Sequence, residues 1–308
     1  MKITIVGSGG VGGYFGARLA QSGCEVGFVA RGMHLAAIRA EGLRIESQLG
    51  DCILAHANAS ENPRDFGTPD YVFLSVKLWD AEDALRALTP VVGENTTVIS
   101  FQNGVQKDEL IRSILGDGVV IGGVGYIGST IARPGVIHHT GTMQRLVFGE
   151  YNGARSQRVI ALQEACIRGG IDAEISLDIR RTIWEKFVFL VGLSATTTAM
   201  RMTLGPIRSN LQTREFLLDV MREVVSVGRA HGVQLDEDYG EKRMSFVDGL
   251  SPDMDSSMHA DLQRDKRLEL QWLSGAVVDL GKAVGIPTPM NRAVRDILAL
   301  HSNGSQKA

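Results

Sequence analysis

The amino-acid sequence predicts an α/β fold in which a doubly wound, mostly parallel sheet precedes an all-helical domain. In the first half of the chain, short apolar runs alternate with segments of helical spacing, a pattern typical of repeated strand–helix–strand units. After about residue 178 the strand-like runs end and long helical patterns follow. The length of 308 residues suits about two domains. We therefore predict one domain over residues 1–178 and a second over residues 179–308.

The strands of the first domain are predicted to be buried on both faces. Their apolar runs are brief and nearly continuous, as expected for parallel strands that helices cover on either side. We expect strands over residues 3–6, 26–29, 71–76 and 97–101, and helices over residues 14–22, 34–41, 81–88 and 108–115. Strand-like pieces over 119–124, 136–139 and 144–148 follow, separated by Pro134-Gly135 and Thr140-Gly141, which predicts hairpins at the sheet edge.

The second domain is predicted to be helical. Helices are expected over residues 179–202, 210–231, 253–264 and 267–284. Gly232 and Gly285 follow two of these segments, and glycine is the residue that most often ends a helix. The apolar helices suit either internal packing or a homodimer face, and the sequence does not choose between the two.

The composition excludes several classes of protein. The net charge is −3, and no run of Lys and Arg is long enough to follow a phosphate backbone, so we expect no nucleic-acid partner. The most apolar stretch, Phe187–Leu193, is far shorter than the roughly 18 residues that a membrane span needs. The apolar run Ile3–Val6 is too short for a secretory signal. We expect a cytoplasmic protein without a membrane segment.

Disulfide and metal chemistry are not expected. The three cysteines are odd in number, lie far apart and form no CxxC pair, which favours a reducing compartment. His138 and His139 are adjacent in a predicted strand, where neighbouring side chains point to opposite faces, so the pair is unsuited to binding one metal ion.

The first strand is followed by a glycine-rich turn, Gly7-Ser8-Gly9-Gly10-Val11-Gly12, and then by a helix expected to begin near Gly13 or Tyr14. A GxGxxG turn between a strand and a helix is the phosphate-binding element of the Rossmann-type fold. Its glycines permit a tight turn, a close approach of backbone to the pyrophosphate, and packing of helix on strand. The sequence therefore predicts a dinucleotide site, with a plain glycine turn as the alternative.

The end of the second strand indicates which dinucleotide binds. NAD enzymes usually carry an acidic residue there to hold the ribose hydroxyls, and this chain has Ala30-Arg31-Gly32 instead. The guanidinium of Arg31 suits a 2′-phosphate, so we predict NADP(H). The alternative is a solvated surface arginine.

Two ionisable residues of the second domain lie on predicted apolar helix faces. Lys186 shares its face with Leu190, and Glu269 shares its face with Trp272 and Ala276. Desolvation lowers the pKa of a buried ammonium and makes it a usable proton donor. Spacing alone also allows Lys186 to lay its stem on the core with its head in water, and Glu269 to be an ordinary first-turn acid.

Polar residues at two strand ends and one helix start are further candidates. Lys77 and Asn103 follow predicted parallel strands, at the rim where open α/β sheets bind ligands. Asn103-Gly104 is also simply a favoured turn. Ser256-Ser257 suits either a bound carboxylate or an ordinary helix start.

Over almost its whole length, the chain resembles the ketopantoate reductase (2-dehydropantoate 2-reductase) family. The residues that carry the resemblance, besides the glycine turn and Arg31, are Ser75-Val76-Lys77, Phe101-Gln102-Asn103-Gly104-Val105, Trp184-Glu185-Lys186, Ser256-Ser257-Met258, Glu269 and Gly285-Ile286-Pro287-Thr288-Pro289. The resemblance implies NADPH-dependent reduction of 2-dehydropantoate to pantoate, a step of pantothenate biosynthesis.

The same resemblance implies a role for each matched residue. Gly7 to Gly12 and Arg31 would hold NADPH, and Lys77 and Asn103 would lie near the nicotinamide and the substrate. Lys186 would be the general acid, and Glu269 would orient substrate or cofactor and tune that lysine. Ser257 would bind the substrate carboxylate.

The chain departs from the family pattern on the helix that carries Lys186. The family usually has asparagines four and eight residues after this lysine, and here these positions are Leu190 and Ser194. Ser194 remains a candidate substrate contact, whereas Leu190 cannot hydrogen-bond the substrate hydroxyl. The alternative function is therefore a related 2-oxo-acid reductase or 2-hydroxy-acid dehydrogenase with a different substrate, for example a bulkier one. A lesser alternative is an NADP-binding sensor without catalysis.

Overall fold

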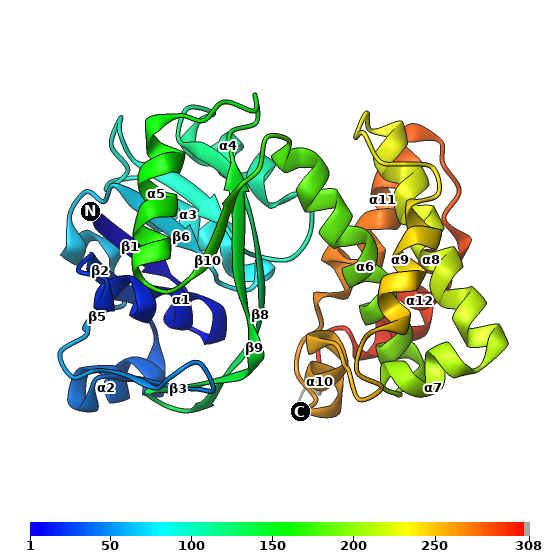
Figure 1. Cartoon of the computed structure of the whole chain (residues 1–308), viewed down its shortest axis with the longest axis horizontal. Helices are drawn as coiled ribbons and strands as arrows, with labels where there is room; N and C mark the ends of the chain where they lie inside the picture. The colour runs from blue at the N-terminus through cyan, green and yellow to red at the C-terminus, as the bar shows by residue number, and fades with distance from the viewer. Residues whose placement is uncertain (305–308) are drawn as a thin grey trace. The chain divides into compact units, whose positions relative to one another are not determined.

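The computed structural model describes residues 1–304 as a mixed α/β unit and a helical unit (Figure 1). Residues 305–308, the end of the predicted second domain, lie outside the described part. The first unit comprises Met1–Gln102 and Gln106–Thr182, and the second comprises Asn103–Val105 and the chain from Ile183 onward. The predicted boundary after residue 178 therefore differs in two places. The first residues of the long helix pack with the sheet, and a short loop from the first half packs with the helices.

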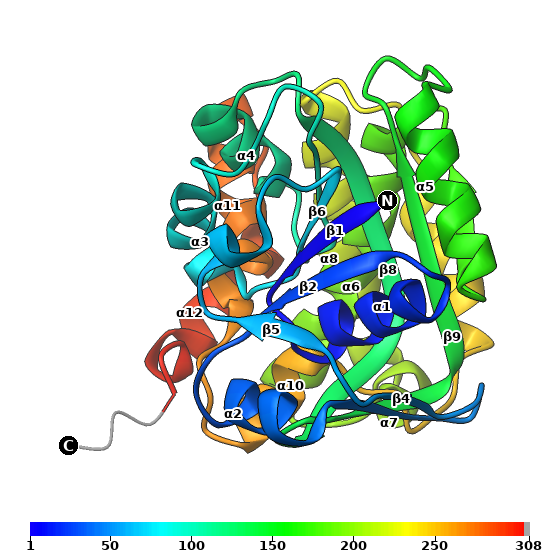
Figure 2. The same ribbon diagram turned by 90° about the vertical axis from the view of Figure 1, so that its left-hand side faces the viewer.

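Parallel strands form the first part of the sheet, in the order β5-β2-β1-β6-β7-β8 (Figure 2). Their bounds are β1 Lys2–Val6, β2 Glu25–Val29, β5 Asn58–Ser60, β6 Tyr71–Leu74, β7 Thr97–Ser100 and β8 Val120–Arg133. The chain leaves β1 for β2 on one side and later returns to β6 on the other side. Ligands bind at such a switch point, beyond the carboxyl ends of the strands.

The β8–β9 hairpin continues the sheet and does not end it. The turn at Pro134-Gly135 is confirmed, and β9 (Val136–Gly149) runs antiparallel to β8. Beyond it lie β3 (Leu43–Ser47) and β10 (Asp172–Ile175), both parallel to β9, and β4 (Cys52–Leu54), antiparallel to β3. The predicted turn at Thr140-Gly141 is wrong. The register shifts between the pairs Ile127–Gln144 and Gly128–Thr140, so this segment is a bulge within one long strand.

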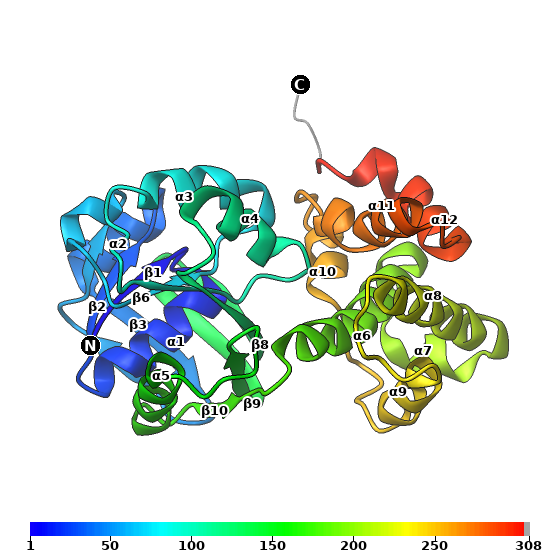
Figure 3. The same ribbon diagram turned by 90° about the horizontal axis from the view of Figure 1, so that it is seen from above.

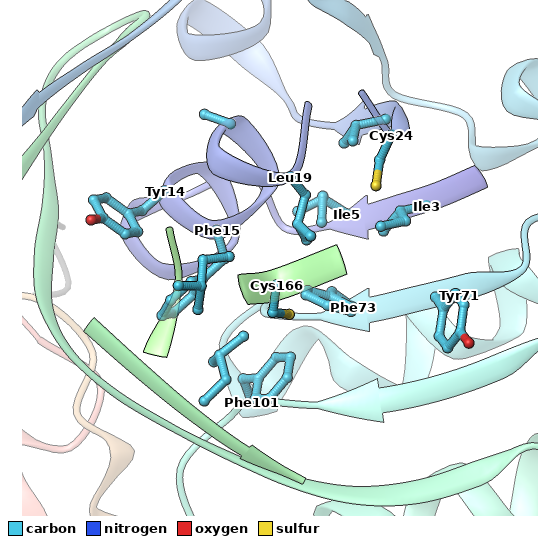
Figure 4. Close-up of a cluster of buried hydrophobic side chains, with 14 of the residues drawn as sticks. Ile3, Ile5, Tyr14, Phe15, Leu19, Cys24, Tyr71, Phe73, Phe101 and Cys166 are labelled. Carbon is cyan, nitrogen blue, oxygen red and sulfur yellow. The ribbon is translucent and has the colours of Figure 1, made fainter. Parts of the chain in front are cut away.

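Helices cover both faces of the parallel strands (Figure 3). Helices α1 (Gly10–Gln21) and α5 (Gln157–Arg168) lie on one face, and α3 (Ala81–Leu88) and α4 (Lys107–Leu115) on the other; α2 (Gly32–Glu41) follows β2. In β6, Tyr71 and Phe73 belong to the first core, whereas Val72 and Leu74 belong to the second. Figure 4 shows the first core, where Phe15 of α1 packs near Phe73 and Phe101. The two-step alternation of side chains along each strand thus fills two cores.

The second unit is built from helices around its own core. Its elements are α6 Ile179–Met200, α7 Leu204–Ser209, α8 Leu211–Ala230, α9 Tyr239–Asp248, α10 Ser257–Gln263, α11 Ser274–Val284 and α12 Pro289–Leu298. Within residues 1–304, none of the helices combines the length and apolarity that a bilayer crossing requires. The fold class predicted from the sequence is confirmed.

Two of the predicted helices of this unit are wrong in extent. The segment expected over 253–264 forms a helix only over Ser257–Gln263. The segment expected over 267–284 is a 3₁₀ turn, Glu269–Trp272, followed by α11. The break lies at Leu273, whose φ of −105° and ψ of −104° are not helical. The apolar period continues across the break because both pieces face the same core, so periodicity alone did not reveal it.

Candidate functional site

The glycine turn lies at the switch point of the sheet. Gly7 follows β1 with a φ of +95°, and the carbonyl of Val29 accepts the N–H groups of Gly7 at 3.3 Å and Ser8 at 3.1 Å. A Cβ on Gly7 would lie 2.5 Å from the backbone nitrogen of Val76, just beyond β6. Only a residue without a side chain fits between these two strand ends.

The next two glycines of the turn have different surroundings. A Cβ on Gly9 would meet no atom of residues 1–304 within 4 Å, whereas one on Gly10 would collide with the carbonyl of Ser129 on β8. Helix α1 begins at Gly10, not near Gly13 or Tyr14 as expected, so its first N–H groups belong to the motif itself. Within residues 1–304 the buried hydroxyls of Ser75 and Ser129 have no hydrogen-bond partner. This combination fits an anionic group such as a pyrophosphate.

The end of β2 lies beside a pocket of about 340 Å³. Arg31 is exposed and precedes the first residue of α2 in an extended conformation. The pocket is lined by Gly32, Leu35, Ala36, Arg39, Ser60, Glu61 and Asn62. Sequence analysis missed Glu61, because β5 before it is three residues long and was not predicted. Glu61 and Arg39 thus line a pocket in the region where the sequence analysis placed only Arg31.

Lys77 follows β6, half-buried, and its ammonium lies 5.6 Å from the ring centroid of Trp79. The glycine turn, Arg31 and Lys77 all belong to the first unit.

The structure brings three of the predicted site residues together in the second unit. The ammonium of Lys186 lies 3.4 Å from Oδ1 of Asn103, and Nδ2 of Asn103 lies 3.4 Å from Oε2 of Glu269. Lys186 comes from α6, Glu269 from the 3₁₀ turn, and Asn103 from the loop that follows β7. The Asn103 amide therefore bridges a cation and an anion from distant parts of the chain.

These three side chains differ in how deeply they are buried. Glu269 is 5% exposed, while Lys186 and Asn103 are half-buried. Glu269 lies in a 3₁₀ turn and not on an α-helical face with Trp272 and Ala276, so the geometric argument from spacing was wrong although the carboxylate is buried. A buried carboxylate needs a hydrogen-bond donor, and Asn103 supplies one.

The remaining predicted substrate contacts have unequal surroundings. Leu190 is half-buried, and Ser194 is 0% exposed with a hydroxyl that has no partner within residues 1–304. Ser257 is exposed at the start of α10. Its neighbour Ser256 is buried, and its hydroxyl lies 2.8 Å from that of Thr197 on α6. Of the two serines, Ser256 therefore has the structural role, and Ser257 keeps its hydroxyl at the surface.

The loop that carries Asn103 is anchored at both ends, which sequence analysis missed. Before it, Nε2 of Gln102 donates to the carbonyl of Val76 at 2.7 Å. After it, the buried ammonium of Lys107 donates to the carbonyls of Ser100 at 2.6 Å and Gly123 at 2.7 Å. Burial lowers the pKa of Lys107, and the adjacent Asp108 carboxylate opposes that shift. No local sequence pattern marks Lys107, because it lies on α4 and its two carbonyl partners lie on β7 and β8.

Metal ligation has no evident place in this arrangement. Within residues 1–304, no three or more His, Cys, Asp or Glu side chains are grouped so that they could hold a metal ion.

Comparisons with known proteins agree over both units. The chain matches the family model "Ketopantoate reductase PanE/ApbA" over residues 3–153 and its C-terminal counterpart over residues 178–302. It is 33% identical to a 2-dehydropantoate 2-reductase of Mesorhizobium japonicum, covering 96% of this chain and 95% of that one. It is 30% identical to the uncharacterized oxidoreductase YkpB of Bacillus subtilis, covering 96% of both chains.

Solved structures show the same likeness. A PanE/ApbA family ketopantoate reductase from Ralstonia eutropha superposes with a TM-score of 0.89 at 32% identity, covering 98% of both chains. A D-mandelate dehydrogenase with NADH and anilino(oxo)acetate superposes with a TM-score of 0.88 at 20% identity, covering 98% of both chains, which shows a shared fold. The glycine turn at the switch point, the Asn103-bridged pair and the match over both halves agree, and the chain belongs to the ketopantoate reductase family of oxidoreductases.

Proposed function

We propose that this protein reduces a 2-oxo acid to a 2-hydroxy acid with NADPH, and that 2-dehydropantoate is its substrate. The observation that carries the proposal is the Asn103 amide that bridges Lys186 and Glu269. A half-buried ammonium and a buried carboxylate that share one amide are unusual unless they act on a ligand. The family membership supplies the reaction class. The product formed from 2-dehydropantoate is pantoate, which would enter pantothenate biosynthesis.

NADPH, when bound, would supply the hydride that reaches C2 of the oxo acid, and the protein's own residues would supply the proton and the positioning. Lys186 donates a proton to the C2 oxygen, so that the ketone becomes a hydroxyl without a free alkoxide. Asn103 accepts from the Lys186 ammonium and keeps it aimed at this oxygen. Glu269, held by the other end of the same amide, balances the lysine charge and orients substrate or cofactor. Ser257 and Ser194 are the proposed contacts to the substrate carboxylate and hydroxyl.

The cofactor is proposed to lie along the glycine turn, with its pyrophosphate on the first N–H groups of α1. Arg31 would pair with a 2′-phosphate, which favours NADPH. Lys77 would face the nicotinamide end. Glu61 lines the pocket beside the end of β2, and its carboxylate would accept hydrogen bonds from ribose hydroxyls, so NADH is measured alongside NADPH.

A second substrate class is favoured by Leu190. A half-buried leucine offers an apolar surface and no hydrogen bond where the family usually has an asparagine. Such a pocket accepts a bulkier 2-oxo acid and gives up a polar contact to the pantoate hydroxyl.

The test is steady-state oxidation of NADPH and NADH with 2-dehydropantoate, 2-oxoisovalerate and phenylglyoxylate, compared as kcat/KM. We expect 2-dehydropantoate with NADPH to give the highest value. A higher value with phenylglyoxylate would replace the substrate and retain the chemistry. Binding of NADPH without turnover of any 2-oxo acid would leave only the sensor function.

A further inference from the structure

His34 links two segments of the first unit through both of its ring nitrogens. Its Nε2 lies 2.8 Å from the carbonyl oxygen of Ser8, in the glycine turn. Its Nδ1 accepts the backbone N–H of Gly135, at the tip of the β8–β9 hairpin, at 3.0 Å. Because a backbone N–H can only donate, Nδ1 carries no proton, and Nε2 is the nitrogen that donates to Ser8. The two bonds together require the neutral ring with its proton on Nε2.

The surroundings of His34 agree with a neutral ring. Burial lowers the pKa of His34 below its ordinary value of 6.5, and the hydrogen bond to the Ser8 carbonyl opposes this shift without reversing it. Both partners are buried as well, since Ser8 is 2% exposed and Gly135 is buried. A buried polar group without a hydrogen-bond partner is destabilised by desolvation. Losing His34 would therefore destabilise the present positions of the Ser8 carbonyl and the Gly135 N–H.

The hairpin that His34 contacts is also the outer wall of the glycine turn. The backbone of Ser129 and Thr130 on β8 approaches Gly10 so closely that a Cβ there would collide with it. Ser129 also carries one of the partnerless buried hydroxyls of this region. The turn is therefore enclosed by β6 on one side and by the hairpin on the other, and His34 connects the turn to the hairpin.

We propose that His34 is a positioning residue of the cofactor site, which fixes the Ser8 peptide relative to the hairpin so that the following N–H groups face the pyrophosphate. The inference rests on the proposed function, because it assumes that the glycine turn binds a dinucleotide. His34 itself does not touch the reacting atoms. Its loss is therefore expected to weaken nucleotide binding and to leave the chemical step intact.

The experiment measures the NADPH Kd by calorimetry, together with KM for NADPH and kcat, for the full chain and three variants. His34→Ala removes both hydrogen bonds and is expected to raise Kd and KM for NADPH about 10- to 100-fold with kcat within about twofold. His34→Gln offers an amide oxygen for Gly135 and an N–H for Ser8, and is expected to stay within about threefold of wild type. His56→Ala, at an exposed position of the same unit, is the matched control and is expected to change neither constant.

Three results would overturn the inference. One is an unchanged Kd in His34→Ala. Another is an equal loss in His34→Gln, which would show that the hydrogen bonds are not the cause. The third is a fall of kcat without a change in Kd. If His34→Ala does not fold, His34→Leu, which refills the volume, takes its place under the same criteria. Wild-type protein that binds no nicotinamide nucleotide would instead contradict the proposed function itself.

Discussion

The glycine turn of the first unit and the Lys186 group of the second unit are built in different ways. The glycine turn of the first unit is a stretch of backbone that packs closely against its neighbours, since a Cβ on Gly7 would collide with backbone just beyond β6 and one on Gly10 with backbone of β8. The Lys186 group of the second unit consists instead of side chains, since Lys186 from a helix and Glu269 from a 3₁₀ turn each lie 3.4 Å from the amide of Asn103, which comes from a loop. We therefore expect the glycine turn to be disturbed by added atoms, and the Lys186 group to be disturbed by the removal of atoms.

The largest effect is expected from Lys186→Ala, which removes the proposed proton donor. General acid catalysis contributes about 10²- to 10⁴-fold, so we expect kcat with 2-dehydropantoate to fall about 10³-fold. The NADPH Kd, measured by calorimetry, should stay within about threefold of wild type. Lys242→Ala, at an exposed lysine of the same unit, is the control and should leave kcat unchanged. A loss of only a few-fold in Lys186→Ala would show that another group donates the proton.

The reverse test adds one methyl group to the glycine turn. Gly10→Ala forces a Cβ against the carbonyl of Ser129, so we expect a loss of about 1–3 kcal/mol in stability and a lower Tm. Gly9→Ala meets no atom and has an ordinary φ of −76°, so its Tm should not change. Its methyl would instead stand where the pyrophosphate is proposed, and the NADPH Kd should rise about tenfold or more.

Equal Tm values for the two glycine variants would contradict the close approach of β8. A wild-type Kd in Gly9→Ala would place the nucleotide elsewhere.

Arg31→Asp tests the other proposed part of the cofactor site in the first unit, where a side chain and not backbone is proposed to select the nucleotide. Loss of a charge-assisted pair and gain of a negative charge should raise the NADPH Kd by about 30-fold and leave the NADH Kd within about threefold. Glu61→Gln, in the pocket beside the end of β2, should instead raise the NADH Kd more than the NADPH Kd if Glu61 holds the ribose of NADH. An equal rise in Kd for both nucleotides would show that Arg31 does not bind the 2′-phosphate.

The parts of the fold that sequence predicted are those with a strong local signal. Strands β1, β2, β6 and β7 appear as near-continuous apolar runs because helices cover both of their faces. Helices α6 and α8 differ from their predicted bounds by at most two residues at either end. The short strands β3, β4, β5 and β10 were missed, since three to five residues that pair at a distance carry no clear period. Missing β5 also concealed Glu61.

The site followed the same rule. The glycine turn consists of consecutive residues, so the sequence located it directly. Lys186 and Glu269 were only candidates by spacing, and the interaction through Asn103 joins residues 83 and 166 positions apart. His34 had no recognisable pattern at all, because its two partners lie 26 and 101 residues away. Long-range geometry of this kind is set by the packing of whole elements.

The smallest expected effect is a change in stability that distinguishes two buried carboxylates, those of Glu150 and Glu269. Glu150, 7% exposed, accepts from Nε of Arg158 and from the hydroxyl of Ser156, both at 2.6 Å, and has no place in the proposed reaction. Burial alone would raise the pKa of Glu150, but these hydrogen bonds outweigh it and hold the pKa below its ordinary value of 4.5. Glu150→Gln should cost about 2 kcal/mol of stability at neutral pH and leave kcat unchanged, whereas Glu269→Gln should lower kcat.

The pH dependence of the stability difference between wild type and Glu150→Gln tests whether the charge of Glu150 stabilises the fold. A carboxylate whose folded-state pKa is lowered stabilises the protein above its ordinary pKa, and this contribution is lost as pH falls through the folded-state pKa. Urea unfolding should therefore show a stability gap between wild type and Glu150→Gln that is constant above about pH 6 and shrinks below the ordinary pKa of 4.5. A gap that persists unchanged at acid pH would mean that the glutamine disturbs packing. In that case Glu150 would stabilise the fold through its shape and not its charge, and the contrast with Glu269 would rest on kcat alone.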